Sequence, residues 1–226
     1  MYSKAGPRSE LKARPPATFS EQDIQRLIEF FSKTGDRVLD PFVGSGSTLI
    51  AAMRTGRNGT GIELTRRWAD IARQRIAREE NLFTAAAEQS IIVGDACAEL
   101  TNIEAASFDF IVTSPPYWRI LTKKAGMKAK AERKDRGLPT QYSDDDAVLG
   151  NIENYDEFLA ELAKVFKQCG RVLKPDRYMA VIVSDFRHGP RFYLYHADIA
   201  EHIERAGIPP KGVTILSRFN KTLYPF

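Results

Sequence analysis

Short apolar runs alternate with amphipathic stretches along this chain of 226 residues. The apolar runs have the length of strands and predict them at residues 37–42, 59–64, 90–96, 108–112, 178–185 and 213–217. Apolar residues at helical spacing predict helices over residues 20–31, 66–78, 155–172 and 197–205. Strands that alternate with helices favour an α/β domain, in which helices cover both faces of a mostly parallel sheet.

Two of the predicted helix boundaries have specific sequence signals. Ser20 and Asp23 have the spacing of a capping-box-like helix start. A proline in residues 174–176 predicts the turn that leaves the long helix. A length of 226 residues fits one α/β domain, so we expect a single domain over residues 1–226.

The stretch Thr113–Trp118 follows the fourth predicted strand directly. Its two prolines end the strand, because proline cannot donate to a sheet ladder. Parallel strands of an open α/β sheet direct their C-terminal ends toward the ligand crevice. The stretch offers the hydroxyl of Ser114, the carbonyl of Pro115 and the ring of Tyr117. These groups suit a flat ring with an exocyclic amine, which would stack on the tyrosine and donate to the two oxygens.

A glycine-rich turn, residues 43–48, joins the first predicted strand to a helix. It is not a phosphate loop, because no lysine follows its second glycine, and it lacks the third glycine of a dinucleotide site. Asp40, Glu63 and Asp95 stand at the ends of successive predicted strands. An acid at the second strand end can accept ribose hydroxyls. The alternatives are a plain strand-to-helix turn and acids that cap helices or face solvent.

Composition excludes several classes of protein. Apolar residues make up 43%, which is enough for a core, and no apolar run approaches the length of a membrane span. The N-terminus lacks a secretory signal, and Cys97 and Cys169 form no disulfide framework or metal-binding spacing. We therefore expect a cytoplasmic protein without a bound metal.

Two motifs together carry a specific resemblance: Asp40–Thr48 and Thr113–Tyr117. In one chain they resemble the exocyclic-amino DNA methyltransferases, which form N4-methylcytosine or N6-methyladenine from S-adenosyl-L-methionine. The resemblance runs from Pro16 to Phe226 and implies a single Rossmann-like class I S-adenosyl-L-methionine-dependent methyltransferase domain. It also implies a last, antiparallel strand, so the seventh strand of that fold is missing from the six predicted above.

The resemblance also implies roles for individual residues. Ser114, Pro115, Pro116 and Tyr117 would be catalytic. Thr18 and Phe19 would close over the methionine end of the cofactor, Glu63 would bind its ribose, and Asp95 with Ala96 its adenine. The full set implied to bind the cofactor is Thr18, Phe19, Asp40, Pro41, Phe42, Gly44, Gly46, Ser47, Thr48, Glu63, Leu64, Asp95 and Ala96.

Within this family, serine at position 114 leans toward cytosine N4, and adenine N6 is the alternative. Neither cysteine has a setting suited to a nucleophile, so methylation of cytosine C5 is not expected. Either amine must leave the duplex to reach the motif, which implies base flipping. A reading of another class also stays open: an inactive module that binds the cofactor and nucleic acid, or a fragment that needs a partner.

Residues 119–150 are rich in lysine and arginine at their start and predict a flexible, DNA-contacting loop, whereas residues 1–19 predict an N-terminal arm. The alternative for the loop is a solvated segment that does not contact DNA. The alternative for Trp118 is a place in the hydrophobic core. The residues predicted to bind DNA are Trp118, Arg119, Lys123, Lys124, Lys128, Lys130 and, in the loop after the fifth strand, Arg187 and Arg191. Double-stranded DNA is thus the expected partner. A cognate restriction endonuclease and the oligomeric state are left open.

Overall fold

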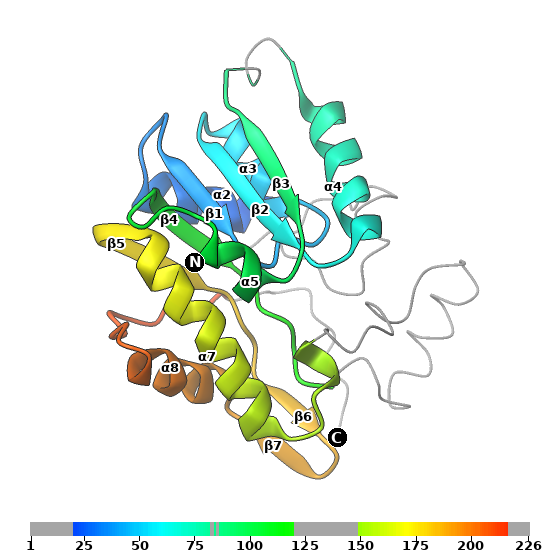
Figure 1. Cartoon of the computed structure of the whole chain (residues 1–226), viewed down its shortest axis with the longest axis vertical. Coiled ribbons are helices and arrows are strands. Elements are labelled where there is room, and N and C mark those ends of the chain that lie inside the picture. The colour runs from blue at the N-terminus through cyan, green and yellow to red at the C-terminus, as the bar shows by residue number, and fades with distance from the viewer. Residues whose placement is uncertain (1–19, 82–83, 85, 120–148, 217–226) are drawn as a thin grey trace.

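The computed structural model describes residues 20–81, 84, 86–119 and 149–216. Its main feature is a parallel five-stranded sheet in the order β3-β2-β1-β4-β5 (Figure 1). The strands are β1 (Arg37–Asp40), β2 (Asn58–Glu63), β3 (Gln89–Val93), β4 (Phe108–Thr113) and β5 (Leu173–Val181). The predicted α/β class with a mostly parallel sheet is confirmed.

Helices cover both faces of this sheet (Figure 1). Helices α2 (Glu21–Phe31), α3 (Ser47–Arg54) and α4 (Arg66–Glu79) lie on one face, and α5 (Ala96–Thr101), α7 (Tyr155–Val172) and α8 (Tyr195–Arg205) lie on the other. A short 3-10 turn, η3 (Leu149–Asn151), precedes α7. Within the described residues, no helix is both long and apolar enough to cross a membrane.

Two hydrophobic cores hold the layers together. Val38 of β1 packs with Ile28 and Phe110 on the α2 and α3 face, whereas its neighbour Leu39 packs with Phe166 on the α7 face. Successive side chains of a strand point to opposite faces, so a strand covered by helices on both faces is buried along its whole length. All six residues of β4 are accordingly buried.

The start of α2 differs from the prediction. The Ser20 side chain makes no capping hydrogen bond, and its backbone carbonyl instead accepts from the N–H groups of Asp23 and Ile24 at 3.1 and 3.2 Å. Asp23 is only 1% exposed, and its carboxylate pairs with Arg26 at 3.8 Å. The predicted capping box is therefore wrong, although the helix itself is confirmed.

The region after α7 also differs. The predicted turn at residues 174–176 lies inside β5, as an irregularity between the pairs Phe108–Leu173 and Phe110–Tyr178. The strand ends at Val181 rather than at residue 185. Strands β6 (Phe186–His188) and β7 (Arg191–Tyr193) then form an antiparallel hairpin where a loop was predicted. Helix α5 was not predicted at all.

The last predicted strand is wrong in its described part, residues 213–216. These residues form no strand, and Val213 and Ile215 are 79% and 80% exposed. A short apolar run forms a strand only when a neighbouring strand pairs with its backbone groups. None of the five strands of the described sheet pairs with this segment.

Candidate active site

A cleft of about 1220 Å³, including the solvent at its mouth, lies at the C-terminal ends of β1, β2 and β4. The strand order reverses between β1 and β4, because the chain runs outward from β1 to β3 and then crosses back to β4. Ligands of open α/β sheets bind at such a switch point. The cleft therefore lies where the topology favours a site.

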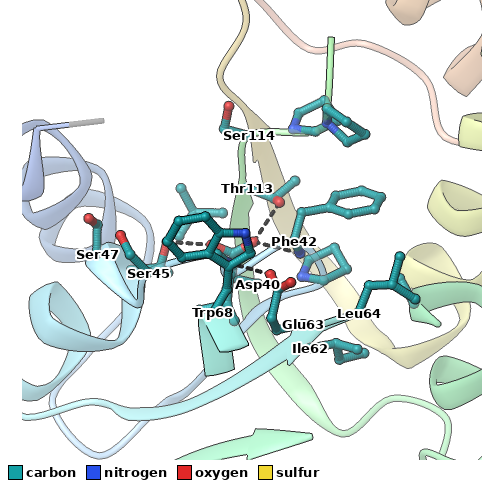
Figure 2. A pocket seen from close by; sticks show the side chains of 18 of the residues that line it. Asp40, Phe42, Ser45, Ser47, Ile62, Glu63, Leu64, Trp68, Thr113 and Ser114 are labelled. Carbon is teal, nitrogen blue, oxygen red and sulfur yellow. Dashed lines mark hydrogen bonds between the residues drawn. The ribbon is translucent and has the colours of Figure 1, made fainter. Parts of the chain in front are cut away.

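Asp40, at the end of β1, joins three parts of the cleft (Figure 2). Its Oδ1 accepts hydrogen bonds from the Thr113 hydroxyl at 2.6 Å and the Phe42 N–H at 3.0 Å, and its Oδ2 accepts from the Thr48 hydroxyl at 2.5 Å. Burial raises the pKa of the Asp40 carboxyl, and these three donors partly oppose the rise. One carboxylate thus ties the end of β4 to the start of α3.

The glycine turn is shaped by two residues with positive φ. Gly44 and Gly46 have φ of +52° and +81°, a region that L-amino acids with a Cβ rarely adopt. A Cβ on Gly46 would also meet the Cβ of Ala72 at 3.0 Å, so this glycine lets α3 and α4 approach. The backbone N–H of Gly44 points toward β2 and donates to Glu63 Oε2 at 3.1 Å.

Glu63 ends β2 and faces the same cleft. Its Oε1 accepts from the N–H and the hydroxyl of Thr65, both at 2.9 Å. Burial raises the pKa of the Glu63 carboxyl, and the donors from Thr65 and Gly44 partly oppose this. A carboxylate offers about four lone-pair positions, so the three donors from Thr65 and Gly44 leave room on Oε2 for one more.

Asp95 lines the cleft next to Ala96 and is exposed. Its side chain caps α5 by accepting from the Ala98 N–H at 2.9 Å. The helix-capping alternative therefore applies to this acid, and a role toward adenine stays a prediction.

The residues predicted to be catalytic all lie at the opposite wall of the cleft, directly after β4. The Tyr117 hydroxyl accepts from the Ser184 N–H at 2.8 Å, and the Tyr195 hydroxyl donates to the Pro116 carbonyl at 2.9 Å. Among the described residues, neither the Ser114 hydroxyl nor the Pro115 carbonyl has a hydrogen-bond partner. The segment is thus held in place while two of its acceptors stay available.

Most residues predicted for the cofactor lie together at this cleft. Those that line it are Asp40, Pro41, Phe42, Gly44, Ser47, Thr48, Glu63, Leu64, Asp95 and Ala96. Gly46 does not line it, because it packs against α4 instead. Thr18 and Phe19 lie outside the described residues. Lining a cleft does not establish a role, so the individual roles stay predictions.

The residues predicted to bind DNA lie in different environments and do not form one described site. Trp118 is 8% exposed, and its Nε1 donates to the Ile152 carbonyl at 2.9 Å, which matches the alternative of a place in the core. Arg119 pairs with Glu153 at 3.3 Å. Arg187 donates to the Pro190 carbonyl at 2.9 Å, and Arg191 stacks on the ring of Tyr193 at 4.7 Å. Lys123, Lys124, Lys128 and Lys130, like most of the predicted 119–150 loop, lie outside the described residues.

Sequence reasoning missed several residues of the site. Trp68 has the helical spacing of an apolar core residue of α4, yet it lines the cleft. Tyr195 lay outside its predicted helix, and no local signal shows that it supports the catalytic segment. Arg75 is 5% exposed and donates through Nη1 to the Ser45 carbonyl and, at 2.9 Å, to the Ser45 hydroxyl, while Nη2 pairs with Glu21. A buried arginine on a helix rich in exposed arginines cannot be recognised from spacing alone.

Comparison with known proteins agrees with this geometry. The model of the N6/N4 methyltransferase family, described as DNA methylase, matches residues 3–74 and 108–212. The chain belongs to this family. The methyl donor of this family is S-adenosyl-L-methionine. The matched ranges include both motifs that carried the resemblance.

Curated relatives match over shorter stretches. The chain is 42% identical over 64 residues to type II methyltransferase M2.DpnII of Streptococcus pneumoniae, and 51% identical over 51 residues to type II methyltransferase M.MthZI of Methanothermobacter thermautotrophicus. These stretches cover 28% and 23% of this chain, and only 24% and 14% of the two relatives. The matched part is thus a small share of each relative.

Solved structures show the fold alone. The chain resembles precorrin 8w decarboxylase of Methanobacterium thermoautotrophicum with a TM-score of 0.50 at 14% identity, covering 86% of this chain and 75% of the other. A phosphoethanolamine methyltransferase of Haemonchus contortus matches with a TM-score of 0.49 at 18% identity, over 82% of this chain and 36% of the other. The Rossmann-like fold is confirmed.

The cleft fits S-adenosyl-L-methionine chemically. The cofactor carries a sulfonium and an ammonium against one carboxylate, so its net charge is positive. Asp40, Glu63 and Asp95 line the cleft, and its described lining contains no lysine, arginine or histidine. A carboxylate at the end of β2 is also the group that suits a ribose in this kind of fold. The residues present therefore match the cofactor of the family.

Proposed function

We propose that this protein transfers a methyl group from S-adenosyl-L-methionine to the exocyclic N4 of a cytosine flipped out of DNA. The observation that carries the proposal is the single cleft at the sheet switch point. The glycine turn and the strand-end acids line one side of it, and Ser114, Pro115, Pro116 and Tyr117 line the other. A methyl donor and an acceptor amine would thus meet within one enclosed space.

The cofactor half of the cleft would hold the donor. Glu63 would accept from a ribose hydroxyl, Asp95 from the adenine amine, and the turn around Gly44 would lie against the methionine portion. The bound cofactor supplies an electrophilic methyl group on sulfur. Asp40 does not need to touch it, because its three hydrogen bonds already hold β1, α3 and β4 in register.

The catalytic half would prepare the acceptor. The lone pair of an aromatic amine is delocalised into its ring, which makes the nitrogen a weak nucleophile. Hydrogen bonds from the amine protons to the Ser114 hydroxyl and the Pro115 carbonyl would favour a pyramidal nitrogen and localise the lone pair. The Tyr117 ring, anchored by its hydroxyl on Ser184, would stack on the base. In-line attack then needs mainly positioning and electrostatic support, with no covalent enzyme intermediate.

The choice of cytosine rests on Ser114, because serine at this position leans toward cytosine N4 in the family. Adenine N6 is the alternative, since a hydroxyl can accept from either amine. The experiment is to incubate the protein with the cofactor and mixed-sequence DNA, and to identify methylated nucleosides by mass spectrometry. N4-methylcytosine supports the proposal, and N6-methyladenine would keep the chemistry but replace the base.

A matched pair of variants tests the mechanism. Ser114→Ala removes the hydroxyl acceptor and should abolish methyl transfer, while cofactor and DNA affinity barely change. Ser90→Ala, on the outer strand β3 and away from the cleft, should transfer at the wild-type rate. Activity in Ser114→Ala would refute the mechanism. Cofactor binding without product in the wild type would instead favour the inactive binding module or a partner-dependent fragment.

We also propose that the loop of residues 119–150, which is rich in lysine and arginine at its start, contacts DNA beside the flipped base. Its two flanks meet at the cleft: the Arg119 N–H donates to the Gly150 carbonyl at 3.1 Å, and Leu149 lines the cleft. Replacing Lys123, Lys124, Lys128 and Lys130 by glutamine should flatten the salt dependence of DNA affinity, because fewer counterions would be released on binding. An unchanged slope would dismiss this role.

A further inference from the structure

Trp68 places a buried, unused hydrogen-bond donor in the cleft. Its side chain is 2% exposed, and its Nε1 has no hydrogen-bond partner although it is fully buried. Buried polar atoms are nearly always paired, and leaving one unpaired costs about 1–3 kcal/mol. Trp118, the other tryptophan, shows the usual arrangement, since its Nε1 donates to a backbone carbonyl at 2.9 Å.

The position of Trp68 follows from local structure. It is the third residue of α4, which begins three residues after Glu63 at the end of β2. Side chains on a helix lean toward its N-terminus, so this ring leans over the end of the sheet. Figure 2 shows the indole standing between Ser45 on one side and Phe42 with Glu63 on the other, with its nitrogen turned toward the latter side.

The chemistry of the surroundings restricts what can pair with this donor. The indole N–H donates only, so its partner must accept. The nearby acids Asp40 and Glu63 line the same cleft but do not bond to it. A carboxylate ligand placed beside these acids would be repelled by them. A hydroxyl is suited to the position, because it can accept from Trp68 and donate to the free position on Glu63 Oε2.

Resting on the proposed function, we propose that Trp68 is a cofactor-binding residue whose indole N–H donates to a ribose hydroxyl oxygen of the bound cofactor. Glu63 and Trp68 then form a matched acceptor and donor for the ribose. Three donors already occupy Glu63, so it has room for about one hydroxyl rather than two. A second group on the wall of the cleft is therefore needed to recognise the sugar fully.

The test is equilibrium binding by calorimetry, with S-adenosylhomocysteine and its 2′-deoxy and 3′-deoxy analogues as ligands. Trp68→Phe keeps an aromatic ring but removes the N–H donor and part of the indole volume, and the comparison between ligands separates these two effects. It should weaken binding of S-adenosylhomocysteine by about threefold to tenfold, as expected for one hydrogen bond. With the analogue that lacks the contacted hydroxyl, the variant and the wild type should bind equally.

Two results would overturn the inference: equal affinity of both proteins for S-adenosylhomocysteine, or the same fold loss with all three ligands, which would indicate a structural effect. Failure of the wild type to bind S-adenosylhomocysteine would instead overturn the proposed function and this inference with it. A second measurement needs no variant. In the wild-type protein, S-adenosylhomocysteine should shift the Trp68 indole N–H resonance and slow its hydrogen exchange, with the Trp118 signal as reference. An unaffected Trp68 signal would refute the contact.

Discussion

Thr113→Val tests whether Asp40 joins the two halves of the site. Thr113 is 1% exposed, and its hydroxyl donates to Asp40 Oδ1 at 2.6 Å, across 73 residues of sequence. Valine has nearly the same shape but lacks the hydroxyl, so the variant removes one donor from a buried carboxylate. Hydrogen bonds to charged groups contribute about 1.5–3 kcal/mol. We expect the free energy of unfolding to fall by about 2 kcal/mol, because Thr48 and Phe42 still donate to Asp40.

The loss should depend on pH in a definite direction. Burial raises the pKa of Asp40 in the folded protein, and the Thr113 hydrogen bond lowers it, so the variant raises this pKa further. An acid whose pKa is higher in the folded state than in the unfolded state loses stability as pH rises through the folded pKa. The destabilisation by the variant should therefore be smaller in acid, where Asp40 is protonated in both proteins and Thr113 donates to a neutral acid in the wild type, and it should grow as pH rises and Asp40 ionises.

Thermal unfolding measures this directly. For a chain of this size, about 2 kcal/mol corresponds to a drop in Tm of about 4–8 °C. Thr60→Val on β2 is the control, because its hydroxyl meets only the Ser90 hydroxyl at 3.2 Å in an exposed place, and it should change Tm little. Methyl transfer should also slow in Thr113→Val, since Ser114 is the next residue. A Tm equal to wild type near neutral pH, or the same drop in acid, would refute the reasoning.

Two further variants test the supports of the site. Tyr195→Phe removes the hydroxyl that donates to the Pro116 carbonyl. It should lower kcat several-fold and the free energy of unfolding by about 1 kcal/mol, and calorimetry should show unchanged cofactor affinity. An unaltered kcat would argue against a supporting role of Tyr195. Arg75→Met removes the buried donor to Ser45 while filling its volume. It should lower the free energy of unfolding, measured with denaturant, by about 2–3 kcal/mol. This is less than the loss for a fully broken buried ion pair, because Arg54 still pairs with Glu21. The variant should also weaken cofactor binding. If Arg75→Met bound the cofactor with wild-type affinity, the glycine turn would not depend on the hydrogen bonds from Arg75.

The contrast between α7 and the C-terminal segment shows when a pattern suffices. Helix α7 has the predicted bounds, Tyr155–Val172, because apolar residues at helical spacing meet a sheet face that is present. Residues 213–216 are rich in apolar residues of strand length but form no strand. A helix satisfies its own backbone hydrogen bonds, whereas a strand depends on a neighbour that its own sequence does not specify.

The sequence alone predicted the order of β1 to β5 along the chain and the placement of both motifs, because periodicity is local and parallel strands end at one edge of a sheet. It thereby predicted that Asp40, Glu63 and Ser114 lie near one another at the C-terminal edge of the sheet. Only the tertiary structure decided which atoms meet. The bond between Thr113 and Asp40 and the turning of Trp68 into the cleft depend on how strands pair and helices rotate as they pack. Those choices are set by contacts between residues far apart in the chain, which no local pattern records.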